Sequence, residues 1–374
     1  SDVSKHAATK DDGTPIPVRV YADKVSASSF VGTEGSDSGA RDIRGKQLAA
    51  IGTQASVAMD IYKRVFGIDY PFDKLDLVAD PMGSFYGQAP SSVIYLGFGV
   101  FRGEGTVASF GGSDISKFNK DVVAHEVGHQ WWGSRVTNSN DRNYWFVESL
   151  AELSSALYVE EVFGRKRYLD KVADWRKNVL DAKPWASVQN GYTVWAGEGP
   201  TPIANIYNKG PYAFHILRST FGDDKFFAFL KELGRGLNGK EIVTRDIQAV
   251  MERVYQGNMD WFFDQWIRGV GMPQYAVFYT IRPTEDGKWL VQGKIRQRVV
   301  AGENNTEMPG VFFRAVAPMT FVAPDGKKFR SSSKVLVQGP ETPFQFKLPQ
   351  EAVEVVFNDE GEILAQDVLY NQSW

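Results

Sequence analysis

The spacing of apolar residues predicts a chain that is mainly helical up to about residue 270. From residue 46 to residue 66 apolar positions recur three and four apart, and the pattern stops at Gly67, a common residue after a helix. Similar spacing predicts further helices at 117–132, 146–163, 166–180, 210–221, 223–233, 244–255 and 259–268. Short segments bounded by glycine or proline predict strands at 17–22, 74–80 and 91–99.

The pattern changes near residue 272. Beyond it, apolar and polar residues alternate in short segments separated by turn signals, such as the one around Gly326, which can take a positive φ. This alternation predicts an antiparallel β-sandwich over residues 273–374. Residues 1–14 are polar, and we expect them to form a loosely held lead-in. The prediction is therefore an α+β chain with one domain at 15–272 and another at 273–374.

Composition narrows the classes of function. The chain has 374 residues, 43% hydrophobic and 13% aromatic, which is typical of a folded protein with a large core. Its net charge of −3 and lack of a basic run argue against nucleic-acid binding. No segment approaches the roughly 18 apolar residues of a membrane span. Oligomeric state and side-chain preference are left open.

Two further features bear on the origin of the chain. The absence of cysteine excludes disulfides, thiolate catalysis and cysteine-bound zinc. It leaves the compartment undetermined, although it is compatible with an exported bacterial protein. Because the chain begins at Ser1 rather than at methionine, we interpret it as a piece of a longer protein, whose signal peptide or upstream domain would precede it.

Two of the four histidines lie together in the octet HEVGHQWW, residues 125–132. In a helix, His125 and His129 share one face, so both imidazoles can bind the same zinc ion. Glu126 is then placed to take a proton from the attacking water while zinc stabilises the developing charge. The surrounding residues are apolar, and polar groups buried there need partners or a cation. The alternative is an amphipathic helix with two ordinary histidines.

A zinc site needs a third protein ligand, and the other two histidines do not suit. His6 lies in the polar lead-in, and His215 lies in an ordinary helical pattern. Glu148 begins the next predicted helix, with eighteen residues between it and His129, and the intervening loop could bring it to the metal. Glu152, one turn later, could orient a ligand. For Glu152 we favour an exposed position on a surface helix.

The octet and its surroundings resemble a known family. HEVGHQWWGSRVT, followed at this spacing by Glu148 in WFVESLAE, resembles the aminopeptidase N family of zinc metallopeptidases, which includes the leukotriene epoxide hydrolases. Stretches at 66–81, 206–222 and 259–277 also agree, so the resemblance covers roughly residues 15–374. It implies a thermolysin-like, largely helical peptidase domain followed by a β-sandwich. The family's large N-terminal β-domain has no counterpart in this chain.

The resemblance also implies roles for individual residues. His125, His129 and Glu148 would hold one catalytic Zn²⁺, and Glu126 would be the general base. Tyr207, in Tyr-Asn-Lys-Gly, matches the family's tyrosine that donates a hydrogen bond to the oxyanion formed during peptide hydrolysis. Without the resemblance, Tyr207 would be taken for an ordinary core or rim tyrosine.

One departure from the family lies in the strand that binds substrate, which Gly87, Gln88 and Ala89 match here. Ala89 stands where the family's exopeptidases carry a glutamate that binds the free α-amine of the peptide, and a methyl group cannot pair with an ammonium. Gln88 supplies no charge, and Glu104 and Glu198 are alternatives on neighbouring loops. We therefore predict an aminopeptidase-like zinc peptidase. The alternatives are an endopeptidase or epoxide-type hydrolase on the same scaffold, and a non-catalytic peptide-binding module.

Overall fold

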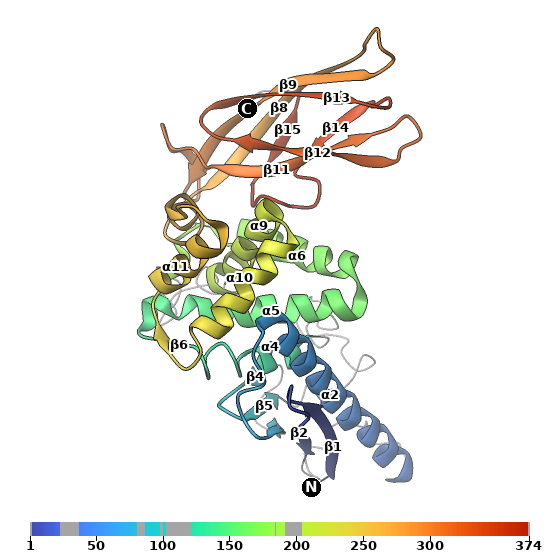
Figure 1. Cartoon of the computed structure of the whole chain (residues 1–374), viewed down its shortest axis with the longest axis vertical. Coiled ribbons are helices and arrows are strands. Elements are labelled where there is room, and N and C mark those ends of the chain that lie inside the picture. The colour runs from blue at the N-terminus through green and yellow to red at the C-terminus, as the bar shows by residue number, and fades with distance from the viewer. Residues whose placement is uncertain are drawn as a thin grey trace. The chain divides into compact units, whose positions relative to one another are not determined.

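The chain consists of helices and β-sheets (Figure 1). The computed structural model describes residues 2–22, 37–80, 87–97, 100–101, 121–183, 185–190 and 204–372. The chain divides into two compact units, Ser1–Tyr168 with Phe227–Val250, and Leu169–Phe226 with Met251–Trp374. Each unit is described below by itself. Among the described helices, none has the length and apolar character needed to cross a membrane.

The first unit contains a five-stranded sheet in the order β1-β2-β3-β5-β4. Its strands are β1 Asp2–Thr9, β2 Pro15–Ala22, β3 Leu75–Asp80, β4 Gly87–Gln88 and β5 Val93–Gly97. The central strands β2, β3 and β5 are parallel, and β1 and β4 pair antiparallel at the two ends of this order. The predicted strands at 17–22, 74–80 and 91–99 correspond to β2, β3 and β5.

The first residues differ from the prediction. Residues 2–9 form β1, which pairs with β2 along its whole length, from Asp2 opposite Ala22 to Thr9 opposite Pro15. The prediction of a loosely held lead-in is therefore wrong for these residues. The apolar pattern of β1 is weak, since Val3 is exposed and Ala8 is buried. Backbone pairing with β2 holds the strand in place, and such pairing leaves little trace in hydrophobic spacing.

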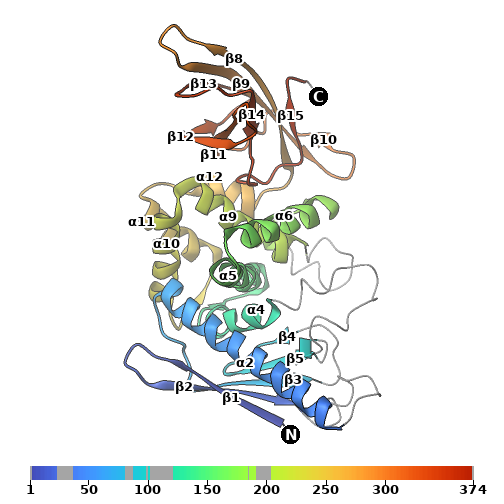
Figure 2. The same ribbon diagram turned by 90° about the vertical axis from the view of Figure 1, so that its right-hand side faces the viewer.

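Three helices complete the part of the first unit that concerns the candidate site. They are α2 Asp37–Phe66, α4 Val122–Gly128 and α5 Trp145–Phe163. Figure 2 shows α2 lying along the sheet, where it packs against β1, β2 and α4. The helix α4 ends before the predicted residue 132, because the chain turns after His129 and Gly133 takes φ +118. Residues 117–120 of the predicted helix lie outside the described residues. Two short strands, β6 Thr137–Asn138 and β7 Glu241–Ile242, pair in parallel.

The remaining helices follow the predicted pattern closely. They are α6 Arg165–Asp181, α9 Gly210–Phe221, α10 Asp223–Gly236, α11 Thr244–Tyr255 and the short α12 Asp260–Phe262. Short 3₁₀ turns lie at Asp141–Asn143 and Val188–Asn190, and π-helical turns at Asn205–Lys209 and Phe263–Ile267. The predicted helix at 259–268 is thus a helical turn followed by a π-helical one.

From Met272 onward the described chain forms strands, as the change of pattern predicted. They are β8 Met272–Pro283, β9 Trp289–Ala301, β10 Thr306–Glu307, β11 Ala315–Val322, β12 Lys328–Val337, β13 Glu341–Leu348, β14 Glu354–Phe357 and β15 Val368–Tyr370. One sheet has the order β10-β9-β8-β15 with β13 also paired to β9, and a second has the order β12-β11-β14. All these pairs are antiparallel except β15 with β8.

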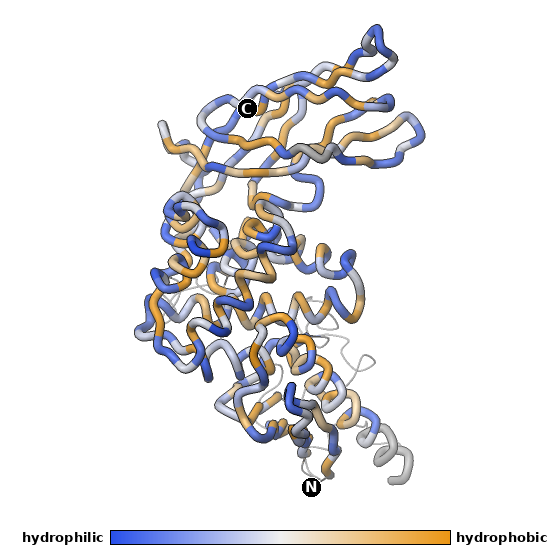
Figure 3. The backbone as a smooth tube through the Cα atoms, viewed as in Figure 1, coloured by the Kyte–Doolittle hydropathy of each residue, from blue (hydrophilic) through white to orange (hydrophobic). Residues whose placement is uncertain are grey.

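The side chains of these strands explain why the alternation was informative. In β13, Phe344, Phe346 and Leu348 are buried while the residues between them are exposed. Figure 3 shows the same change between hydrophobic and hydrophilic residues along the strands. Gly326 takes φ +81 in the turn between β11 and β12, as predicted. The predicted domain bounds, 15–272 and 273–374, stay a prediction.

Candidate metal centre

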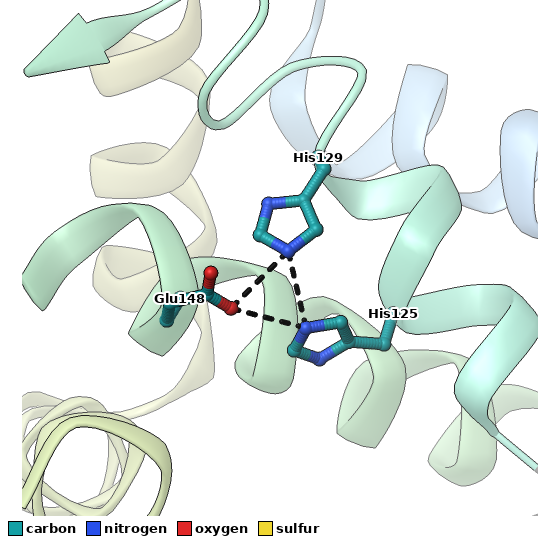
Figure 4. Close-up of side chains that lie close together, drawn as sticks. All are labelled: His125, His129 and Glu148. Atoms are coloured by element: carbon teal, nitrogen blue, oxygen red, sulfur yellow. Dashed lines mark hydrogen bonds and ion pairs between the residues drawn. The ribbon is translucent and has the colours of Figure 1, made fainter. Parts of the chain in front are cut away.

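Three side chains predicted as metal ligands point toward one another (Figure 4). Nε2 of His125 lies 3.1 Å from Nε2 of His129, and Oε2 of Glu148 lies 3.3 Å and 3.2 Å from these two nitrogens. His125 belongs to α4, His129 directly follows that helix, and Glu148 lies in the first turn of α5. The loop between the helices therefore returns the chain so that the carboxylate faces both imidazoles.

Local backbone geometry accounts for this convergence. His129 ends α4 but keeps helical angles, with φ −63 and ψ −17, so it still shares a face with His125. Gly128 allows α4 and α5 to approach closely. A carbon attached to Gly128 would lie 3.1 Å from Cβ of Ser154 and 3.3 Å from Cα of Ala151. A larger residue at this position would push the two helices, and with them the two halves of the cluster, apart.

The three residues fit a zinc ion. Zinc ligands at about 2.0–2.1 Å in a tetrahedral arrangement lie roughly 3.3–3.4 Å from each other, close to the separations found here. Only 12% of each histidine side chain and 7% of the Glu148 side chain are exposed. Burial alone would raise the pKa of Glu148, but His129 and His125 hold it well below its usual value. Glu148 is therefore the charged carboxylate that a cation requires.

Hydrogen bonds on the far side of each imidazole present the remaining nitrogen to the cluster. Nδ1 of His125 donates to Oε2 of Glu152 at 3.0 Å, and Nδ1 of His129 donates to the backbone oxygen of Trp132 at 3.0 Å. Both bonds place a proton on Nδ1, so Nε2 is the nitrogen available to a metal. Burial lowers the pKa of both imidazoles, but Glu148 and the neighbouring carboxylates raise it further, and a bound metal would take the place of the proton on Nε2. The prediction that Glu152 is exposed is wrong, because only 16% of its side chain is exposed.

Glu126 lies between the cluster and β4. The residue is 5% exposed, and burial raises the pKa of its carboxyl. A carbon attached to Gly87 in β4 would lie 2.1 Å from Oε1 of Glu126, so the carboxyl packs directly on the backbone of that strand. The predicted base and the first residue of the predicted substrate strand are thus neighbours.

The turn that follows β4 is joined to the residue after His129. Gln130 is fully buried, and its Oε1 accepts a hydrogen bond from the backbone nitrogen of Ser92 at 2.8 Å. Its Nε2 lies 3.3 Å from the backbone oxygen of Pro90 and 3.5 Å from that of Ala89. Gln130 therefore ties this turn to the metal-binding segment. The sequence offered no signal for this role beyond the position of Gln130 next to His129.

The described surroundings of Ala89 do not show which group would bind the free amine of a peptide. Ala89 is half-buried and follows β4, whereas Gln88 is exposed within it. Neither residue carries a charge. Glu104 and Glu198, the alternative partners for a substrate amine, lie outside the described residues.

Tyr207 belongs to the second unit, where it is half-buried in the π-helical turn Asn205–Lys209. Such turns occur frequently at functional sites. Lys209, in the same turn, is fully buried, and its Nζ donates to the backbone oxygens of Ala186 at 3.0 Å and Gly269 at 3.2 Å. Burial lowers the pKa of Lys209 to about 7. These bonds fix the turn that carries Tyr207, and the catalytic role of Tyr207 stays a prediction.

Comparisons with known proteins agree with one another. The peptidase family M1 domain matches residues 52–266. Aminopeptidase M1-D of Oryza sativa subsp. japonica is 28% identical over 231 residues, which are 59% of this chain and 25% of that protein. Aminopeptidase 2 of Candida albicans is 24% identical over 280 residues, which are 70% of this chain and 27% of that protein.

The fold of this chain resembles that of a solved structure. The crystal structure of Legionella pneumophila aminopeptidase A in complex with aspartic acid matches with a TM-score of 0.70 and 17% identity. The match covers 100% of this chain and 38% of that one. This chain spans about a quarter of the length of the curated relatives named above.

Proposed function

The chain belongs to peptidase family M1, and from that premise we propose that it is a zinc-dependent, aminopeptidase-like hydrolase of peptide bonds. The observation that carries the proposal is the triangle of His125, His129 and Glu148, whose ligand atoms lie 3.1–3.3 Å apart with Glu126 beside them. The proposal includes the fold implied by the resemblance, a thermolysin-like domain at 15–272 followed by a β-sandwich at 273–374.

His125, His129 and Glu148 would hold the ion through Nε2, Nε2 and Oε2. The chemistry that a zinc ion would supply at these ligands is that of a Lewis acid, which would polarise the carbonyl of the scissile bond and stabilise the charge developing on it. Glu126 accepts the proton of the attacking water. Burial raises the pKa of Glu126, which favours its accepting this proton, and the resulting acid can pass the same proton to the leaving amine when the C–N bond breaks.

Tyr207 would add the second source of charge stabilisation. Peptide hydrolysis converts a neutral carbonyl oxygen into an oxyanion, and a fixed O–H donor stabilises that charge more than it stabilises the starting amide. The π-helical turn, held by the buried Lys209, gives the tyrosine a fixed backbone from which to donate.

The strand β4 is the proposed site for the substrate backbone. Among the described strands it is the last in the order of its sheet, and an extended peptide can add to such an edge through main-chain hydrogen bonds. Gly87 brings this edge against Glu126, which places a bound amide next to the base. Ala89 offers no charge for a free amine, and this observation favours an endopeptidase or epoxide-type hydrolase as the second candidate.

Matched peptides test the proposal. One series has a free amino terminus, the other carries an acetyl group on the same sequences, and zinc content is measured in the same preparations. The proposal predicts zinc-dependent cleavage of the free-amine series. Cleavage of the acetylated series would instead support the endopeptidase. A zinc-loaded protein that binds both series and cleaves neither would support the non-catalytic module.

A further inference from the structure

The carboxylate of Glu148 has a different partner on each oxygen. Oε2 faces His125 and His129, at 3.3 Å and 3.2 Å. Oε1 accepts a hydrogen bond of 2.5 Å from the hydroxyl of Tyr144. The proposed function assigns no role to this tyrosine. Its bond nevertheless engages the oxygen that does not face the imidazoles.

The position of Tyr144 favours this contact. Tyr144 immediately precedes α5 and already has helical angles, with φ −60 and ψ −26. A residue four positions before Glu148 therefore lies over the same face of the helix. A hydroxyl that donates to a charged carboxylate forms one of the stronger hydrogen bonds in proteins, typically about 2.5–2.7 Å long. The contact lies within that range.

The two residues beside Tyr144 are anchored. The indole nitrogen of Trp145 donates to Oγ1 of Thr244 at 3.0 Å, and Oδ1 of Asn143 accepts from the backbone nitrogen of Thr244 at 2.8 Å. Trp145 and Asn143 are both buried. The backbone of Tyr144 is therefore held on either side by one residue of α11, which limits the movement of its hydroxyl relative to Glu148.

We propose that Tyr144 is a positioning residue that makes Glu148 offer one oxygen to the metal. With Oε1 held by the hydroxyl, Oε2 alone is directed at the ion, and the carboxylate does not rotate to use both oxygens. This inference rests on the proposed zinc site but not on the cleavage of any peptide. Residues that orient metal ligands commonly contribute about 10–100-fold to metal affinity.

The test compares Tyr144→Phe with wild type. Zinc affinity is measured by competition with a chromophoric chelator, and the ligand arrangement by the visible spectrum of the cobalt-substituted protein. The variant removes one oxygen and keeps the ring, so the metal-free protein should remain folded, with the loss of thermal stability expected for one hydrogen bond. We expect zinc affinity to fall by about 10–100-fold and the cobalt spectrum to change.

Tyr62→Phe is the matched control. Its hydroxyl donates to the backbone oxygen of Ala124 at 2.8 Å, so this variant also loses a tyrosine hydrogen bond beside the metal-binding helix, but none to a ligand. It should lose stability and keep the zinc affinity and cobalt spectrum of wild type. Wild-type zinc affinity and spectrum in Tyr144→Phe would overturn the inference and leave the proposed function standing. Equal losses of affinity in both variants would also overturn it. No zinc binding by wild type would overturn both proposals.

Discussion

Gly87→Ala is the substitution that tests most directly whether catalysis depends on the observed position of the Glu126 carboxyl. The added methyl group would lie 2.1 Å from Oε1 and 2.2 Å from Cδ of Glu126, whereas ordinary contacts begin at 3.4 Å. Either the strand or the carboxyl must move. The end of a flexible side chain yields more easily than a paired strand, so we expect the Glu126 carboxyl to move by more than about 1 Å.

The size of the effect follows from this displacement. A misplacement of about 1 Å at a reacting group can cost roughly 10²-fold in rate, and a general base typically contributes about 10²–10⁴-fold. We therefore expect kcat to fall by about 10²-fold. An altered rotamer of Glu126 costs only about 0.5–1.5 kcal/mol, so the protein should remain folded. His125, His129 and Glu148 are unchanged, and zinc content should stay at the wild-type level.

The assay measures kcat and KM on the peptide series that wild type cleaves, together with zinc content and thermal unfolding. Gly45→Ala is the matched control, because a carbon attached to Gly45 meets nothing within 4 Å. It should leave kcat and zinc content unchanged. If Gly87→Ala has wild-type kcat while zinc content and stability are normal, Glu126 does not act as the base from this position.

Two further predictions concern the second unit. Tyr207→Phe should lower kcat by about 10²–10³-fold with zinc content unchanged, the loss typical of one oxyanion donor, and an unchanged kcat would assign Tyr207 to packing. Lys209 has a folded-state pKa of about 7, below its ordinary value of about 10.4, so between these values the unfolded chain binds the extra proton. Stability should therefore rise with pH, by about 2 kcal/mol from pH 7.5 to pH 9. Lys209→Met should lack this rise in urea unfolding, and parallel pH profiles for the two proteins would contradict the explanation.

Much of the secondary structure could be predicted because hydrophobic burial is periodic. The helices α6, α10 and α11 and strands such as β13 bury one face, so their spacing is visible in the sequence. In α5 and α9 nearly all residues along most of the helix are buried. The strand β1 could not be predicted in this way. Its stability comes from backbone pairing with β2, and only part of one face is buried.

The same distinction separates the site residues that could be predicted from the sequence from those that could not. His125, Glu126 and His129 are close in sequence, so helical geometry alone places them together, and Glu148 followed from the spacing between two helices. Other residues support the site through backbone atoms or through a single hydroxyl or amide group, and no spacing in the sequence marks them. Gln130 and Tyr144 are of this kind, since an amide and a phenol are ordinary side chains until their partners are known.

We propose that this chain hydrolyses peptides with a zinc ion held by His125, His129 and Glu148 and with Glu126 as the base. The most direct measurement is zinc content and turnover in Glu126→Gln, which keeps the size of the side chain but cannot accept the proton. We predict one zinc per chain, as in wild type, and almost complete loss of turnover. Wild-type turnover by the zinc-loaded variant would contradict the account.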